Sequence, residues 1–147
     1  MWRLRYALAL AIAACAHFRQ KDKIGDAYFW HCWRVGLSVA PGPARVVGIL
    51  HDVIEDHPRW KPIIRWLFPD DVYSALLRLC HPYGQPYYQY IDNVKRNPLA
   101  REVKIADVRD NGNNFRLARI KDGREADRLH VKYRSALARL TDGKDLM

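Results

Sequence analysis

Proline, glycine and asparagine divide this 147-residue chain into short segments in which apolar residues recur at helical intervals. The clearest break is Ala40–Pro43, and the segment 44–56 that follows places Val47, Leu50 and Ile54 three or four residues apart. No run of alternating polar and apolar residues, which would be typical of a strand, occurs in the sequence. The pattern therefore predicts an all-α fold.

Several segments are long enough to form the helices of a small domain. The expected helices cover residues 3–19, 28–39, 44–56, 70–79, 87–95, 98–110 and 124–140. Residues 62–68 form a short apolar segment, and the polar stretches 20–27, 81–86 and 111–114 are expected to be loops. With 49% apolar residues a chain of this length can bury one core, so we expect a single helical domain spanning residues 1–147.

The charge of the chain favours an anionic partner. Lys and Arg number 25 against 16 Asp and Glu, a formal charge of +9. The excess is spread along the chain instead of forming a basic arm, which argues against nucleic acid as the partner. A small anionic ligand and a merely solvated basic surface both explain it.

The cysteines and the N-terminus favour a cytoplasmic protein that has no contact with a membrane. The cysteines have the spacing of neither a disulfide framework nor a zinc site: they are Cys15, Cys32 and Cys80. The apolar run 6–16 is too short to span a bilayer, although its small residues at 14–16 resemble a signal-peptidase site. An amphipathic first helix explains the same run, because four residues share one helical stripe: Leu4, Leu8, Ile12 and Cys15.

The strongest chemical signal is the sequence HDVIED at His51–Asp56. Its four ionisable side chains directly follow an apolar stretch, which places them at the edge of a core: they are His51, Asp52, Glu55 and Asp56. On a helix, Glu55 lies one turn from His51 and Asp52 and on the same face. The combination fits a metal site or a polar pocket, and an exposed helix end with caps and salt bridges is the alternative.

Two further polar residues stand in apolar surroundings. His31 ends an aromatic stretch, where it is either a metal ligand or a hydrogen-bonded core histidine. Asp107 is surrounded by the apolar residues of 103–108, and a buried carboxylate needs a partner such as a metal ion. Asn111 follows one turn later, so its amide is expected to face the same way.

Longer stretches of the chain are similar to one known family. Ala14–Gln20 and Gly25–His31 are similar to an AxxHxxQ…GxPYxxHP pattern, and Ile49–Asp56 to LLHDxxED. Tyr87–Ile91, with the NPLA and VKIAD sequences that follow it in 97–111, is similar to YxxYI…NPLA…VKLADxxDN. The chain thus resembles, over about residues 7–140, the HD-domain metal-dependent phosphohydrolases, in particular the short single-domain (p)ppGpp hydrolases of the RelA/SpoT type.

This resemblance implies a metal centre and a reaction. His31, His51, Asp52 and Asp107 match the H…HD…D ligands of one divalent ion, which is Mn²⁺ in that family. Ligand chemistry alone also suits Fe²⁺, Co²⁺ or Zn²⁺. Glu55 and Asp56 match the pair that orients the attacking water and serves as general acid and base, and the implied reaction removes the 3′-pyrophosphate of (p)ppGpp or a related nucleotide.

The resemblance also implies substrate contacts, and here one residue departs from the family pattern. Asn111 matches a residue that supports the nucleotide, and Tyr133 resembles a tyrosine near the substrate. The nearest candidates to bind the polyphosphate are three lysines: Lys21, Lys23 and Lys104. Asp22 stands where the family often has an arginine that stacks on guanine, which an aspartate cannot do.

The departure at Asp22 leaves alternatives to the guanine nucleotide. One is an HD phosphohydrolase that acts on another pyrophosphorylated nucleotide, a phosphorylated dinucleotide cofactor or a nucleotide monophosphate. A separate alternative, which does not depend on Asp22, is a catalytically inactive HD fold that binds a nucleotide or a partner protein. The sequence leaves a homo-oligomer open.

Overall fold

The helices begin and end close to the residues that the sequence predicts. In the computed structural model, which describes residues 1–144, the five best-predicted helices are α2 (Tyr28–Leu37), α6 (Asp70–Leu79), α7 (Tyr87–Lys95), α8 (Pro98–Asn111) and α10 (Gly123–Thr141). The Asn97 side chain caps α8 by accepting a hydrogen bond from the backbone N–H of Ala100, and Asp122 caps α10 in the same way. The all-α expectation is confirmed, since residues 1–144 contain only an isolated β-bridge, between Lys21 and Ala27.

Other boundaries differ from the prediction. Helix α1 (Trp2–Ala16) ends before the predicted residue 19, because the chain turns there and Arg19 adopts a left-handed conformation, with φ 63°. The predicted continuous helix 44–56 is wrong: α3 (Pro43–Leu50) and α4 (Val53–Asp56) are separated by a turn at His51–Asp52. The sequence reasoning did not predict three short elements as helices: the 3₁₀ helix η1 (Pro58–Trp60), α5 (Lys61–Leu67) and α9 (Asn114–Leu117).

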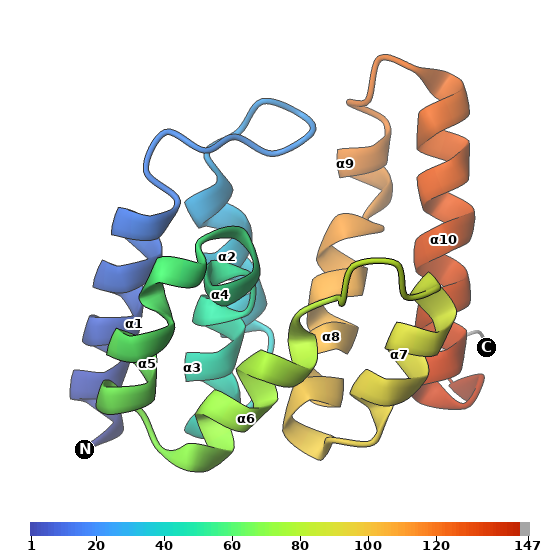
Figure 1. Ribbon diagram of the computed structural model, residues 1–147. Helices are drawn as coiled ribbons and strands as arrows, with labels where there is room; N and C mark the ends of the chain where they lie inside the picture. The colour runs from blue at the N-terminus through green and yellow to red at the C-terminus, as the bar shows by residue number, and fades with distance from the viewer. Residues whose placement is uncertain (145–147) are drawn as a thin grey trace.

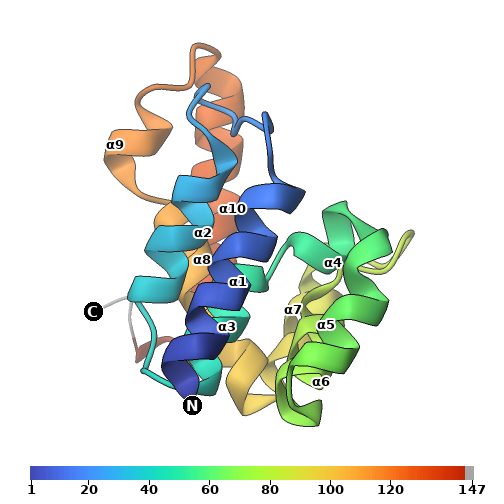
Figure 2. The same ribbon diagram turned by 90° about the vertical axis from the view of Figure 1, so that its left-hand side faces the viewer.

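Helix α3 lies at the centre of the bundle. It packs on α1, α2, α6 and α8, and its residues Val46, Val47 and Leu50 are fully buried. Figure 1 shows α8 between α3 and α10, and it shows the loop 17–27 at the same end of the bundle as the connection between α9 and α10. In Figure 2, α4, α5 and α6 lie on one side of α1 and α3, and α9 lies on the other. None of the helices in residues 1–144 has both the length and the apolar character needed to span a membrane.

Two glycines let α2 and α3 cross at close range. A Cβ atom added to Gly48 would lie 3.0 Å from the Cα of Gly36 and 3.3 Å from the carbonyl oxygen of Val35. A Cβ atom on Gly36 would lie 2.6 Å from Cγ1 of Ile49, so neither position accepts a side chain without movement. This crossing positions α2, which carries His31, against α3, which His51 directly follows.

Gly48→Ala is therefore expected to destabilise the fold. The new methyl group meets backbone atoms, which cannot rotate away, so we expect the free energy of unfolding to fall by about 1–3 kcal/mol. Urea unfolding followed by circular dichroism measures the change. Gly123→Ala is the control, because a Cβ atom at Gly123 meets nothing within 4 Å, and its stability should be equal to or slightly above that of the natural chain. Equal stability of both variants would contradict the close crossing.

Candidate metal centre

Four side chains from three parts of the fold converge on one point. His31 comes from α2, His51 and Asp52 from the turn after α3, and Asp107 from α8. Nε2 of His31 lies 3.2 Å from Nε2 of His51, 3.2 Å from Oδ1 of Asp107 and 4.0 Å from Oδ2 of Asp52. Nε2 of His51 lies 2.9 Å from Oδ2 of Asp52 and 3.6 Å from Oδ1 of Asp107. Two ligands of one ion, each about 2.1 Å from it, lie at most about 4.2 Å apart. The separations that include a histidine fit a shared divalent cation; His31, His51 and Asp52 form the compact group, and Asp107 adjoins it through the two histidines.

The turn between α3 and α4 explains how two neighbouring residues reach this point. On a regular helix, adjacent side chains point about 100° apart. The chain leaves the helix after Leu50, and Asp52 takes φ −103° and ψ −5°. His51 and Asp52 both approach His31 from this turn.

Hydrogen bonds fix the orientation of both imidazoles. Nδ1 of His31 donates to Oδ2 of Asp110 at 2.7 Å, and Nδ1 of His51 donates to the carbonyl oxygen of Gly48 at 2.7 Å. Arg34 holds Asp110 in turn through two hydrogen bonds, of 2.7 and 3.0 Å. With the proton on Nδ1, each neutral ring turns the lone pair of Nε2 toward the other ligands, as metal-binding histidines do.

The candidate centre brings two carboxylates, those of Asp52 and Asp107, close to two buried histidines. His31, His51 and Asp107 are 1%, 1% and 4% exposed, whereas the Asp52 side chain is 20% exposed. Burial opposes the charge on His51, but Asp52 and Asp107 outweigh it and raise the pKa of His51 well above its usual value. Burial likewise opposes the charge on Asp107, but Lys104 and the two histidines hold its pKa well below the usual range. A divalent cation can replace the protons that these carboxylates keep on the histidines.

Side chains next to the ligands complete the hydrogen bonding of the two carboxylates. Lys104 Nζ lies 2.8 Å from Oδ2 of Asp107, and the Asn111 amide donates to Oδ1 of Asp107 at 2.7 Å. The hydroxyl of Tyr28 donates to Oδ2 of Asp52. The expectation that Asn111 faces the same way as Asp107 is confirmed.

A cleft opens beside the candidate metal centre and contains most of the predicted catalytic and substrate-binding residues. Those that line it together with Asp52 and Asp107 are Glu55, Asp56, Lys104, Asn111 and Tyr133. Burial and the nearby Asp52 raise the pKa of Glu55, and burial raises that of Tyr133 to about 12. Lys132, which the sequence reasoning did not assign, also lines the cleft, and its Nζ lies 4.2 Å from the ring centre of Tyr87.

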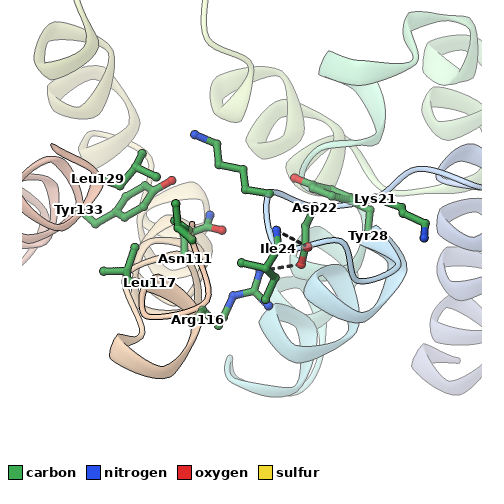
Figure 3. A pocket seen from close by; sticks show the side chains of 11 residues that line it. Lys21, Asp22, Ile24, Tyr28, Asn111, Arg116, Leu117, Leu129 and Tyr133 are labelled. Atoms are coloured by element: carbon green, nitrogen blue, oxygen red, sulfur yellow. Dashed lines mark hydrogen bonds and ion pairs between the residues drawn. The ribbon is translucent and has the colours of Figure 1, made fainter. Parts of the chain in front are cut away.

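Lys21 and Lys23 line a second, adjoining pocket and not the cleft. Figure 3 shows Leu129 and Tyr133 on one side of this pocket and Tyr28 on the other. Three residues line both the cleft and this pocket, which are therefore neighbours: Tyr28, Asn111 and Tyr133. Lys23 forms an ion pair of 3.2 Å with Glu125.

Asp22 has a structural role in the loop that it occupies. Its Oδ1 accepts hydrogen bonds from the backbone N–H groups of Ile24 and Asp26, both at 3.0 Å. Its Oδ2 accepts a 2.9 Å hydrogen bond from Nη2 of Arg116, which also lines the second pocket. An arginine therefore does reach this pocket, but from α9 and not from the position of Asp22.

We searched protein-family models and curated proteins for relatives of this chain. Neither search found a match.

The residues that the sequence reasoning missed differ in how they could have been found. Asp110 lies three residues after Asp107 in a predicted helix, and Tyr28 lies three residues before His31, so helical spacing could have indicated both. Arg116 belongs to a helix that the sequence did not predict.

Asp110→Asn is expected to weaken metal binding without removing a ligand. Both oxygens of Asp110 accept, one hydrogen bond from His31 and two from Arg34, whereas the amide has a single accepting oxygen and no charge, so the His31 ring is held less firmly. We expect the affinity for Mn²⁺ to fall by about 10–100-fold, as measured by isothermal titration calorimetry. Asp92→Asn is the control. Within residues 1–144, Asp92 is seen to pair only with Arg139, and both side chains are exposed. An unchanged affinity in Asp110→Asn would contradict the orienting role.

Proposed function

We propose that this chain is a metal-dependent phosphohydrolase of the HD type that removes the 3′-pyrophosphate of (p)ppGpp or a related nucleotide. The observation that carries the proposal is the convergence of His31, His51, Asp52 and Asp107, whose ligand atoms lie 2.9 to 4.0 Å apart in the pairs that include a histidine. The cleft beside them offers both acidic and cationic side chains. The reaction would yield GDP or GTP and pyrophosphate.

The donor set fits a divalent ion, which would be held by the two Nε2 atoms and by the Asp52 and Asp107 carboxylates. Two imidazoles and two carboxylates suit Mn²⁺, Fe²⁺, Co²⁺ or Zn²⁺, and the resemblance favours Mn²⁺. When bound, such an ion supplies Lewis acidity toward a phosphate oxygen and lowers the pKa of water.

The residues of the cleft then have distinct roles. Glu55, whose pKa is raised by burial and by Asp52, takes the proton of the attacking water, and Asp56 helps to orient that water. Burial disfavours the charge on Lys104, but Asp107 outweighs it and raises the pKa of Lys104, which stays cationic beside the phosphates. Asn111 and Tyr133 lie where the cleft meets the second pocket, so they would contact the nucleoside.

A nucleotide other than a guanine nucleotide is a second candidate substrate, and Asp22 is the observation that favours it. Its carboxylate accepts hydrogen bonds from the loop backbone and from Arg116, so it offers no stacking surface to a base. Ile24, Leu117 and Leu129 supply apolar contacts in the same pocket. We further propose that the protein acts in the cytoplasm, in keeping with its unpaired Cys15, Cys32 and Cys80.

The decisive experiment measures pyrophosphate released from ppGpp and from ppApp by the purified chain, with Mn²⁺ and with a chelator. We expect release from at least one of them with Mn²⁺ and none with the chelator. Release in the presence of the chelator would contradict the metal centre. If metal is bound and neither nucleotide is hydrolysed, the chain is not a 3′-pyrophosphate hydrolase of this kind.

A further inference from the structure

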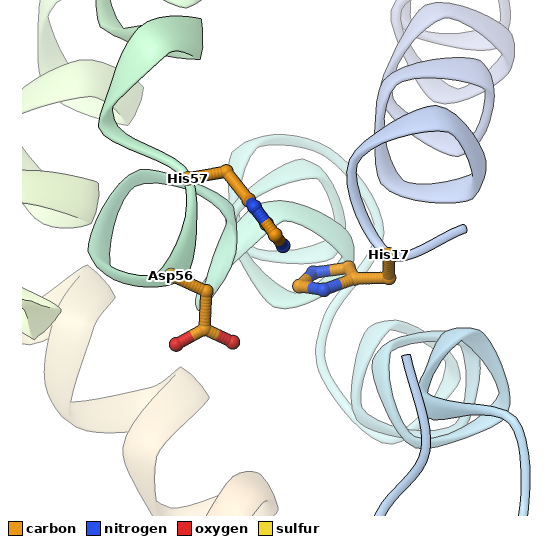
Figure 4. A group of neighbouring side chains, drawn as sticks. All are labelled: His17, Asp56 and His57. Carbon is orange, nitrogen blue, oxygen red and sulfur yellow. The ribbon is translucent and has the colours of Figure 1, made fainter. Parts of the chain in front are cut away.

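A second group of metal-binding side chains lies outside the centre described above. His17 follows α1, while Asp56 ends α4 and His57 follows it. One ligand atom from each of the three lies within 4.8 Å of the other two. Figure 4 shows the nitrogen-bearing edges of the two imidazoles turned toward each other, with the Asp56 carboxylate beside them.

The Gln20 side chain connects all three residues and fixes the protons of both imidazoles. Its Nε2 donates to Oδ2 of Asp56 at 3.0 Å, and an ionised carboxylate can only accept. Its Oε1 therefore faces the histidines, at 2.8 Å from Nδ1 of His17 and 3.0 Å from Nε2 of His57. An amide oxygen only accepts, so each of these nitrogens carries a proton. Neutral His17 then has its lone pair on Nε2.

That lone pair lacks a partner. Nε2 of His17 is buried and has no hydrogen-bond partner among the described residues, and the whole residue is 3% exposed. Burial lowers the pKa of His17, which keeps the ring neutral. A buried acceptor without a partner costs free energy, and such groups in native proteins usually have a bound water or ion to satisfy them.

We propose that His17, His57 and Asp56 form a second site for a divalent metal ion of the Zn²⁺ class. Two imidazoles and one carboxylate are a ligand set that Zn²⁺ takes in proteins, with a further position left to water. The Nδ1–H of His17 already donates to the oxygen of Gln20, which is how the outer partner of a metal-bound histidine is arranged. His57 releases its Nε2 proton to solvent when the ion binds.

The second site is distinct from the proposed catalytic metal site, but it shares Asp56 with the cleft of the proposed hydrolase. It shares no ligand with the cluster of His31, His51, Asp52 and Asp107, and it meets the cleft only through Asp56. His57 is half-buried and Asp56 is exposed, so an ion can enter from solvent without movement of the core.

Equilibrium dialysis against Zn²⁺, followed by elemental analysis, tests the site. His57→Asn is expected to bind one ion per chain fewer than the natural chain, whether or not the first centre is filled. The control is His130→Asn, which alters an exposed histidine of α10 and should bind as many ions as the natural chain. Circular dichroism confirms that each variant is folded.

A measurement on the natural chain keeps the test independent of folding defects. In nuclear magnetic resonance spectra of ¹⁵N-labelled protein, Zn²⁺ is expected to shift the Nε2 resonance of His17 and to leave its Nδ1 protonated. An unmoved His17 resonance at saturating Zn²⁺, or equal numbers of bound ions in His57→Asn and the natural chain, would overturn the proposal.

Discussion

Asp52→Asn is expected to abolish metal binding and the proposed hydrolysis while the helical fold remains. Asp52 is the most exposed of the four ligands, and asparagine has nearly the same shape, so the substitution leaves no cavity. The amide oxygen can still accept the hydrogen bond from Tyr28. What is lost is one of the two negative charges that hold the cation. Loss of a residue that hydrogen-bonds to a metal ligand lowers metal affinity by about 10–100-fold. Because Asp52 is itself a proposed ligand, we expect Asp52→Asn to lower Mn²⁺ affinity by more than about 100-fold.

Mn²⁺ affinity and pyrophosphate release are the two measurements for Asp52→Asn, and both are expected to fall together. Asp70→Asn serves as the control, because Asp70 is 85% exposed and pairs with Arg65 at the surface. Full activity of Asp52→Asn with Mn²⁺ would show that the ion, if any, is held elsewhere.

Glu55→Gln is expected to slow hydrolysis by about 10²–10⁴-fold while Mn²⁺ binding is kept. Glu55 lines the cleft but does not belong to the converging His31, His51, Asp52 and Asp107 cluster. The amide cannot accept the proton of the attacking water. The effect is therefore expected in kcat, whereas the loss in Asp52→Asn comes with a loss of the ion.

The pH dependence of the rate gives an independent check on Glu55. Burial and Asp52 raise its pKa, and a general base works only when it is ionised. The rate of the natural chain should fall as the pH drops through this raised pKa, and that acidic limb should be absent in Glu55→Gln. Glu102→Gln is the control, since Glu102 accepts a backbone hydrogen bond from Ala40 that an amide oxygen can also accept. An unchanged acidic limb in Glu55→Gln would assign the base to another group.

Most of the helices could be predicted because residues next to each other in the sequence mark their ends. Asn97 before Pro98 marks the start of α8, and Pro69 before two acids marks the start of α6. The break at His51–Asp52 was not predictable in this way. The segment 44–56 has helical spacing throughout, so no local signal marks the turn at which His51 and Asp52 meet His31 from another helix.

In the candidate site, too, some residues could be predicted from their sequence neighbours, whereas others depend on contacts between distant segments. His31 and Asp107 could be singled out because each is a polar residue in an apolar segment, and a buried polar side chain needs a partner. The pairing of His17 with His57 had no such signal, because the two come from separate segments that only the folded chain brings together. The role of Asp22 in its loop likewise depends on Arg116, which the chain brings in from α9.

Helix α8 also limits how this chain can vary in length. Lys104, Asp110 and Asn111 each lie three or four residues from Asp107. Together the four supply a proposed ligand, two neighbours of that ligand and the acceptor for His31. One residue inserted between Asp107 and Asp110 would rotate everything after it by about 100° and move it about 1.5 Å along the axis. Asp110 and Asn111 would then leave their partners at the same time. Between residues 104 and 111 the helix therefore tolerates no change of register, because a shift would separate several of these contacts at once.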